Sequence, residues 1–126
     1  MLYGIGTDIV AVARIRELYE RHGERFVGRL LHPAERAGLA ESRDPARFLA
    51  KRFAAKEAFS KALGTGLRSP ATLDAIGVTH DTLGKPEYIC SEELDARLRE
   101  LGVRSHLSIS DEKEFVVAFA VLETIS

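Results

Sequence analysis

Hydrophobic and polar positions change their spacing several times along the chain, and each change predicts a new element. Residues 2–12 are rich in Leu, Ile and Val and predict a strand, with glycines close to its start. Residues 11–22 carry apolar side chains three and four apart, which predicts a helix. Gly23 interrupts this pattern, and the helical spacing then resumes. After a boundary at residue 32, a short helix is expected with Pro33 in its first turn.

The most strongly predicted element is a helix over residues 45–63. This segment is rich in Ala and Leu and contains no internal Gly or Pro. Asp44 is a candidate N-cap, and Pro45 occupies the first helical position, where a missing N–H costs nothing. Gly64 follows directly and is expected to adopt the left-handed conformation that ends many helices.

The second half of the chain alternates short strands with one more helix. That helix covers residues 91–101, with Ser91 as its N-cap and Gly102 as its end. The expected strands are residues 75–81, 87–90, 105–110 and 114–125, the last two joined as a hairpin by the polar residues DEKE. This order predicts a single α+β domain over residues 1–126, with a small antiparallel sheet packed against a long central helix.

Composition narrows the class without fixing a function. The chain is 45% hydrophobic and 29% charged, an ordinary globular balance, and its net charge of −1 argues against nucleic acid as a general partner. Cys90 is the only cysteine, so an internal disulfide and a two-cysteine metal site are both excluded. Its apolar setting favours a buried small side chain over a nucleophile. No signal segment and no membrane-spanning stretch is evident, so we expect a cytoplasmic protein that does not enter the membrane.

The predicted central helix holds charges among its Ala and Phe residues. Glu57 and Lys61 are four residues apart and could form no more than a surface ion pair. Three features favour a functional site instead. The neighbouring side chains suggest burial, where a charge needs a partner. Gly64-Thr65-Gly66 follows at once, and glycines let backbone N–H groups approach a phosphate closely. A second carboxylate, Asp8, lies within the apolar first strand.

Asp8 alone could equally be a turn residue or an N-cap. Together, Asp8 and Glu57 offer hard oxygen ligands, and Mg²⁺ is typically held by one or two carboxylates with substrate phosphates and waters. This set therefore indicates a phosphate-bearing substrate with Mg²⁺. The glycine turn is shorter than a P-loop, and the N-terminal "GIGTD" lacks the third glycine of a dinucleotide motif.

Two further polar patterns have both a structural and a functional interpretation. Arg14, Leu18, Arg21 and Arg25 follow one another at spacings of four, three and four. They form either a solvated helix face or a strip that docks an acidic helix; nucleic acid fits less well, because few aromatic residues alternate with the basic ones. In "SHLSIS", the polar residues His106, Ser108 and Ser110 alternate and therefore share one face of the expected strand. This face is either part of a functional site or a solvated surface.

Four segments of the chain together resemble the holo-[acyl-carrier-protein] synthases, the small phosphopantetheinyl transferases of fatty acid biosynthesis. These segments are, in the family's order, GIGTDIV, FLAKRFAAKEAFSKALGTG, LGKP and HLSIS. The resemblance spans nearly the whole chain and implies the 4′-phosphopantetheinyl transferase fold. It also implies a Mg²⁺-dependent enzyme that moves 4′-phosphopantetheine from coenzyme A to a serine hydroxyl of apo acyl carrier protein and releases adenosine 3′,5′-bisphosphate. The family works as a homotrimer with each active site between two subunits.

The same resemblance implies roles for particular residues. Asp8 and Glu57 match the Mg²⁺ ligands, and Lys61 matches the lysine beside the reacting phosphate, acting either as a cation or as a base. Segments that line the coenzyme A site contain Arg52, Lys61, Gly64, Thr65, Gly66, Pro86, His106 and Ser108. The positions that contact the acidic carrier protein in the family correspond here to Arg14, Leu18, Arg21, Arg25, Phe26 and Phe53. One departure from the family pattern is Asp111, where many relatives carry a histidine.

Two other functions remain open at this level. The chain could be a non-catalytic binding module that captures an acidic helix, or a phosphate-transfer enzyme that uses a different nucleotide. A melting experiment with coenzyme A, Mg²⁺ and ATP separates all three, because any ligand of the native state stabilises it.

Overall fold

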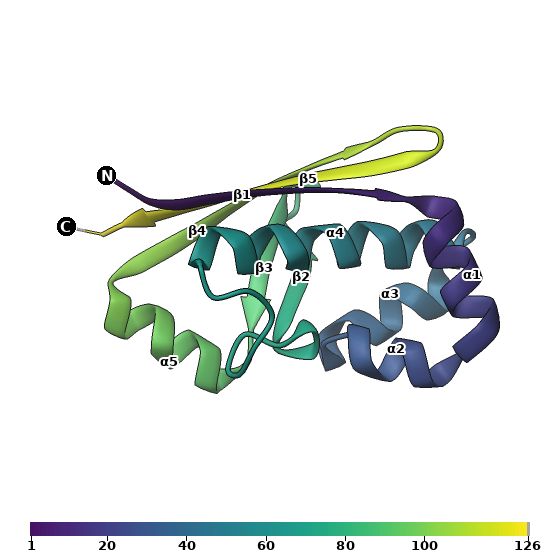
Figure 1. Ribbon diagram of the computed structural model, residues 1–126, viewed down its shortest axis with the longest axis horizontal. Coiled ribbons are helices and arrows are strands. Elements are labelled where there is room, and N and C mark those ends of the chain that lie inside the picture. The colour runs from purple at the N-terminus through teal and green to yellow at the C-terminus, as the bar shows by residue number, and fades with distance from the viewer. Residues whose placement is uncertain (126) are drawn as a thin grey trace.

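The computed structural model describes residues 1–125 of the chain; Ser126, the last residue of the predicted domain, lies outside the described residues. The chain alternates strands with helices, as Figure 1 shows. In chain order the elements are β1 (Leu2–Ala11), α1 (Val12–His22), α2 (Glu24–Leu30), the 3-10 helix η1 (Pro33–Glu35), α3 (Arg36–Glu41), α4 (Pro45–Leu63), the 3-10 helix η2 (Leu73–Ala75), β2 (Ile76–His80), β3 (Pro86–Cys90), α5 (Glu92–Leu101), β4 (Val103–Asp111) and β5 (Phe115–Thr124).

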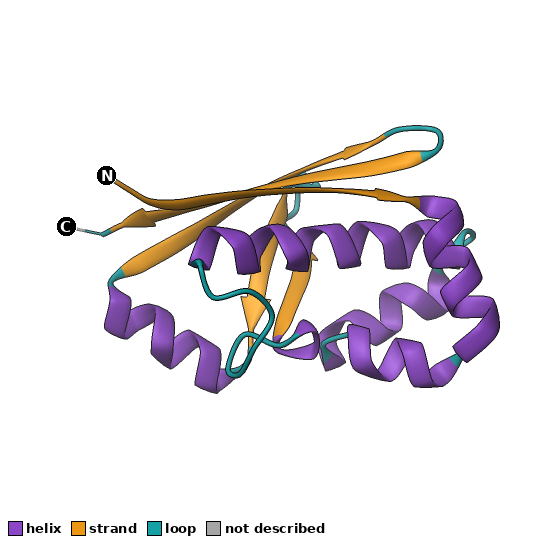
Figure 2. Cartoon of the chain, viewed as in Figure 1, coloured by secondary structure: helices purple, strands orange, loops and turns teal. Residues whose placement is uncertain are grey.

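The α+β class is confirmed, and the strands form two sheets where one was expected. β1, β5 and β4 make a three-stranded antiparallel sheet with β5 in the centre, and β2 pairs with β3 in a separate antiparallel ribbon. Helix α4 lies along one face of the larger sheet, and in the described part of the chain the opposite face of that sheet carries no helix (Figures 1 and 2). None of the helices within residues 1–125 is long and apolar enough to cross a bilayer.

The helix ends follow the local signals in the sequence. Asp44 caps α4, because its Oδ1 accepts a hydrogen bond from the Arg47 N–H at 3.2 Å. Gly64 ends the same helix in the left-handed region, at φ +87°. Ser91 caps α5 in the same way as Asp44 caps α4, and Gly102 ends it at φ +66°.

Strand β1 packs unusually close to helix α4, and two glycines make this possible. A Cβ added to Gly6 would lie 2.7 Å from Ala62 N and 2.9 Å from Lys61 Cβ, and closer still to Ala58 O. The carbonyl of Ala62 obstructs a side chain on Gly4 in the same way. Because side chains alternate along a strand, this approach brings the next residue of the same face, Asp8, directly beside α4.

Candidate active site

At an edge of the larger sheet, Asp8 of β1 pairs with Lys61 of α4, and both lie near enough to Glu57 of α4 for their charges to act on it. The Lys61 Nζ donates to Thr7 O at 2.9 Å and to Asp8 Oδ1 at 3.3 Å. The Asp8 side chain is only 17% exposed, whereas that of Lys61 is 53% exposed. β1 is an edge strand, so within residues 1–125 no further strand covers this group. The three residues expected to be catalytic therefore lie together, and the cation pairs with Asp8 across the β1–α4 contact.

The charge of Asp8 acts directly on Glu57. The pKa of Glu57 is raised above its usual value, first because burial withholds water from the carboxylate and second because Asp8 is negative. The positive charges of Lys61 and Arg14 oppose this rise. Two carboxylates that disfavour each other's charge in a half-buried position are suited to share a cation.

The donor set fits a magnesium ion that takes few ligands from the protein. Within residues 1–125 there is no group of three or more His, Cys, Asp or Glu side chains placed to hold a metal. A metal at this edge would therefore take two carboxylates, from Asp8 and Glu57, and complete its shell with phosphate and water. That pattern is typical of Mg²⁺ in phosphate-transfer sites.

The glycine turn after α4 ends the helix, which is one of the two roles expected of it. Gly66 adopts a positive φ of +70°, as Gly64 does, and all three turn residues are exposed. The N–H of Gly64 bonds to Ser60 O and Lys61 O, and the N–H of Gly66 bonds to Ser60 O at 3.3 Å. These two N–H groups cap the helix in this conformation, and the coenzyme A role expected for the turn stays a prediction. The turn still leaves open space at the end of α4, since nothing lies within 4 Å of a Cβ added at either glycine.

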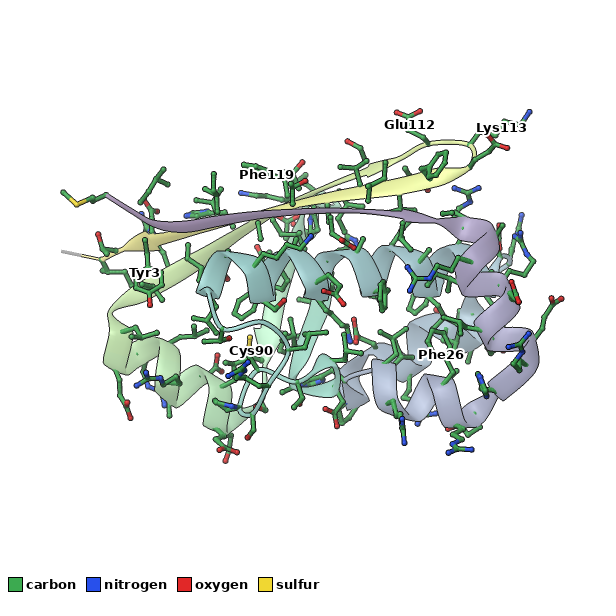
Figure 3. All side chains as sticks on the ribbon, viewed as in Figure 1. Tyr3, Phe26, Cys90, Glu112, Lys113 and Phe119 are labelled. Carbon is green, nitrogen blue, oxygen red and sulfur yellow. The ribbon has the colours of Figure 1, made fainter. Side chains whose placement is uncertain are left out.

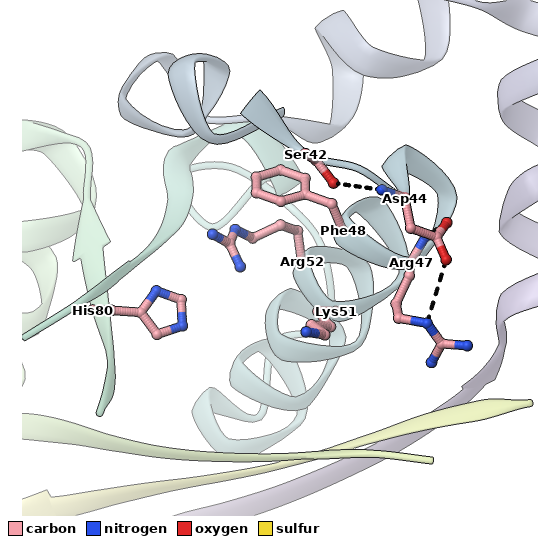
Figure 4. A pocket seen from close by; sticks show the side chains of 7 residues that line it. All are labelled: Ser42, Asp44, Arg47, Phe48, Lys51, Arg52 and His80. Atoms are coloured by element: carbon pink, nitrogen blue, oxygen red, sulfur yellow. Dashed lines mark hydrogen bonds and ion pairs between the residues drawn. The ribbon is translucent and has the colours of Figure 1, made fainter. Parts of the chain in front are cut away.

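Arg52 lies on a different side of α4 from Glu57. It is buried, its Nε lies 3.1 Å from Glu35 Oε2, and its guanidinium stacks 4.2 Å from the centre of the Phe48 ring. It lines a hollow of about 340 Å³ together with Ser42, Asp44, Arg47, Phe48, Lys51 and His80 (Figure 4). The pKa of His80 is lowered, first by burial and then by the charges of Arg52 and Lys51. This basic hollow suits an anionic group.

His106 and Ser108 lie on the face of the larger sheet that points away from α4. His106 Nε2 is 2.7 Å from Glu123 Oε1, which also accepts from Arg104 Nε at 2.6 Å. Pro86 lies near His106, and the two line a second hollow of about 240 Å³. The residues expected around coenzyme A thus lie apart: Arg52 is on the α4 side of the larger sheet, whereas His106 and Ser108 are on its outer face. Pro86 lies between these groups, because it pairs with His80 of the basic hollow and also lines the hollow beside His106.

The arginine strip is divided between two helices. Gly23, at φ +51°, separates α1 from α2, so the spacing that links Arg14, Leu18 and Arg21 does not continue to Arg25. Arg25 and Phe26 instead line a hollow of about 200 Å³ with His22 and Arg29. Figure 3 shows Phe26 on α2, and this side chain packs partly against the core.

Phe53 of α4 and Leu18 of α1 are also partly buried against the core. Arg14 lies near enough to Glu57 to influence its charge. The residues expected to contact a carrier protein therefore begin beside the carboxylate pair and extend along α1 and α2.

Sequence reasoning missed two charged clusters. Lys56 is completely buried and pairs with Glu35 at 2.6 Å, a residue 21 positions earlier with no spacing signal to reveal it. Asp111 pairs with Arg47, and with Lys51 at 2.9 Å, so the residue that departs from the family pattern fastens the β4–β5 hairpin to the start of α4. The prediction for Cys90 is supported, because burial raises its pKa to about 12 and leaves the thiol a poor nucleophile.

Comparison with known proteins identifies the family of the chain. Residues 4–120 match the family model of the 4′-phosphopantetheinyl transferase superfamily. The chain is 62% identical over 123 residues to the holo-[acyl-carrier-protein] synthase of Dechloromonas aromatica, covering 98% of each chain. It resembles the crystal structure of the Neisseria meningitidis holo-[acyl-carrier-protein] synthase with a TM-score of 0.95 and 49% identity, covering 98% of this chain and 100% of that one.

A third similar structure is the holo-(acyl-carrier-protein) synthase of Bacillus anthracis in complex with CoA (3′,5′-ADP). It has a TM-score of 0.82 and 38% identity, with 99% of each chain covered. The identity, the coverage and the shared fold all lead to one assignment. The chain belongs to the 4′-phosphopantetheinyl transferase superfamily and, within it, to the holo-[acyl-carrier-protein] synthases, a family of enzymes.

Proposed function

We propose that this single-domain enzyme transfers 4′-phosphopantetheine from coenzyme A to a serine hydroxyl of an acidic apo acyl carrier protein. The reaction would require Mg²⁺, release adenosine 3′,5′-bisphosphate and serve fatty acid biosynthesis in the cytoplasm. The observation that carries the proposal is the convergence of Asp8, Glu57 and Lys61 at an open sheet edge, in a chain of this family. The relative from Bacillus anthracis in complex with CoA supports the choice of donor.

Asp8 and Glu57 would hold the metal ion. When bound, Mg²⁺ neutralises charge on the pyrophosphate of coenzyme A and orients the leaving group. Without a cation, the two carboxylates repel the pyrophosphate as well as each other. Their place between β1 and α4, fixed by the contact at Gly6, keeps them from moving apart.

Lys61 would contact the phosphate that is transferred. Its Nζ already donates to Thr7 O and Asp8 Oδ1, so it lies beside the proposed metal ligands and is half exposed toward solvent. A positive group at this position stabilises negative charge as the bond to the leaving group breaks. The nucleophile is the serine of the carrier protein, so this chain needs no activated hydroxyl of its own.

We propose a homotrimer in which two subunits complete each site. The outer face of the larger sheet carries apolar side chains that nothing within residues 1–125 covers, among them Ile5, Ile9 and Phe119, which are 56%, 62% and 44% exposed. Figure 3 shows Phe119 projecting from this face. His106 and Ser108 lie on the same face, so a second copy packed here would meet them. An uncovered apolar patch next to polar side chains is typical of a subunit contact.

The acidic carrier protein would dock on α1 and α2. Arg14 is close to Glu57, so a partner that lies along Arg14, Arg21 and Arg25 also reaches the carboxylate pair. Complementary charge steers such an encounter and fixes its orientation. The hollow beside Phe26 offers an apolar contact within this basic surface.

A melting experiment tests the donor and the metal together. Coenzyme A with Mg²⁺ should raise the melting temperature more than the two separate shifts combined, because each ligand of the native state strengthens the site of the other. ATP with Mg²⁺ should have a much smaller effect. A larger shift with ATP would favour a different nucleotide substrate, and no shift with either would favour a binding module.

A further inference from the structure

Glu35 carries a fully buried carboxylate that the proposed mechanism does not use. Its Oε1 accepts from His32 N at 2.9 Å and from Lys56 Nζ at 2.6 Å. Its Oε2 accepts from Val78 N at 3.0 Å. A charge withdrawn from water is costly unless it is paired and hydrogen-bonded, and this carboxylate is both. It connects η1, α4 and β2 behind the basic hollow.

Arg52 is the second cation on this carboxylate. Its Nε is buried and lies 3.1 Å from Glu35 Oε2, a close ion pair without the alignment of a good hydrogen bond. The Phe48 ring packs on the guanidinium at 4.2 Å and adds a cation–π contact. The inner edge of the guanidinium is thus held by a carboxylate and an aromatic face.

The charges of this cluster do not balance. One carboxylate faces two cations, so one positive charge is left over when all three groups are ionised. Lys56 is fully buried and also donates to Leu30 O, which leaves it unable to reach a ligand. Arg52 lines the hollow, and Figure 4 shows its guanidinium between the Phe48 and His80 rings. The surplus charge is therefore available at Arg52.

We propose that Glu35 is a positioning residue for Arg52. It holds the guanidinium by the Nε edge, so that the two Nη groups stay turned into the hollow and bind an anionic group of coenzyme A. This inference rests on the proposed function for the role of Arg52 toward coenzyme A. Glu35 itself touches no ligand, because its side chain has no exposed surface. Lys56 pairs with Oε1 of the same carboxylate, away from the Arg52 contact at Oε2, and takes no part in the positioning.

The test uses Lys56→Met as its reference chain. Glu35→Gln alone would leave the Lys56 ammonium buried without its partner and is expected to unfold. The double variant Glu35→Gln with Lys56→Met removes both buried charges and keeps an amide oxygen for the His32 or Val78 N–H. Lys56→Met alone keeps the contact between Glu35 and Arg52. Circular dichroism and melting establish that both variants fold.

We expect Lys56→Met to keep the KM for coenzyme A within about twofold of wild type. The double variant should raise the KM for coenzyme A about tenfold, which corresponds to about 1.4 kcal/mol of binding free energy. Its kcat should change less than threefold. Arg52→Ala should raise KM at least as much. Adding Arg52→Ala to the double variant should leave KM as in Arg52→Ala alone, because two residues that act through one contact are not additive.

Three results would overturn the proposal. The first is a double variant with the same KM for coenzyme A as Lys56→Met. The second is a multiplication of the KM effects of the Glu35 and Arg52 substitutions when they are combined. The third is an Arg52→Ala chain that binds coenzyme A as tightly as wild type. Calorimetry of coenzyme A binding decides these points without any transfer activity, so the inference can fail while the transferase assignment stands. A wild-type chain that binds no coenzyme A would overturn both.

Discussion

Replacing Gly6 with alanine tests the contact that builds the site. The added Cβ would lie 2.7 Å from Ala62 N, whereas ordinary van der Waals contact begins at 3.4 Å. β1 and α4 would therefore have to separate by at least the 0.7 Å between these two distances, and by more to clear Ala58 O. The atoms in the way belong mainly to the backbone of a buried helix, so they cannot move aside as a flexible side chain would.

This separation has a cost in stability and a cost in rate. Overpacking of a tight core destabilises proteins by about 1–3 kcal/mol, and we expect the upper end here, a fall in melting temperature of roughly 10 °C. The same displacement moves Asp8 away from Glu57. A misplacement of about 1 Å at a reacting centre can lower the rate about 100-fold, so activity should fall by far more than the unfolded fraction explains.

Urea unfolding and coenzyme A turnover, both below the melting temperature of the variant, measure the two effects separately. Gly28→Ala is the matched control, because its Cβ would meet Arg36 Nη2 at 3.7 Å, an ordinary contact, within helix α2. The free energy of unfolding of the Gly28→Ala chain should rise by up to about 1 kcal/mol, since alanine favours a helix more than glycine does. A Gly6→Ala chain with wild-type stability and turnover would show that the close contact at Gly6 does not position Asp8.

The remaining predictions concern charge and assembly. Glu57→Gln should raise the melting temperature of the metal-free chain slightly, because the amide removes a charge that burial and Asp8 disfavour, and it should remove the Mg²⁺-dependent rate. With wild-type Glu57, whose pKa is raised in the metal-free chain, turnover at subsaturating Mg²⁺ should fall with acid at a higher pH than an ordinary glutamate allows, because the proton and the metal compete for the same carboxylate. Over that range the metal-free chain should become more stable as pH falls, because the folded state binds the proton more tightly; a profile flat down to the usual glutamate pKa argues against this. Reversing Arg14 and Arg21 to Glu should raise KM for the carrier protein about tenfold and leave KM for coenzyme A nearly unchanged, and equal effects would count against docking. Phe119→Lys should produce monomers in gel filtration that lose turnover, whereas a trimer of unchanged size would show that the contact lies elsewhere.

Helix α4 shows how much local signals alone can predict. The cap at Asp44, the start at Pro45 and the end at Gly64 were all predicted from the residue types at these positions. Each of these residues acts on backbone groups within one helical turn. The caps of α5 were predictable for the same reason. Such signals need no knowledge of tertiary contacts, because the backbone groups that they satisfy lie within a few residues.

Other features depend on contacts between distant segments. The pairing of Lys56 with Glu35 has no periodic signature, since it joins α4 to a 3-10 helix 21 residues away. The arginine strip was predicted as continuous because spacing rules assume one unbroken helix, and Gly23 ends α1 before Arg25. Sequence does not reveal that the N–H groups of Gly64 and Gly66 both bond to the end of α4, because these bonds depend on the conformation of the turn.

The candidate site itself was only partly predictable. The residue types and the elements of Asp8, Glu57 and Lys61 could be inferred, but their convergence depends on how closely β1 crosses α4. The glycines at positions 4 and 6 permit that approach, and their role becomes visible only in the packing. The separation of Arg52 from His106 could not be inferred either, because which face of a strand is covered depends on the arrangement of the sheet.

Intact-mass spectrometry of an apo acyl carrier protein shows directly whether this enzyme transfers phosphopantetheine. The carrier is incubated with this enzyme, coenzyme A and Mg²⁺, with a chelator control and with the Glu57→Gln chain in parallel. The account predicts a gain of one phosphopantetheine that requires both the metal and Glu57. No gain with several well-folded carriers would contradict the transfer, and a gain that persists with the chelator or with Glu57→Gln would contradict the role given to the carboxylate pair.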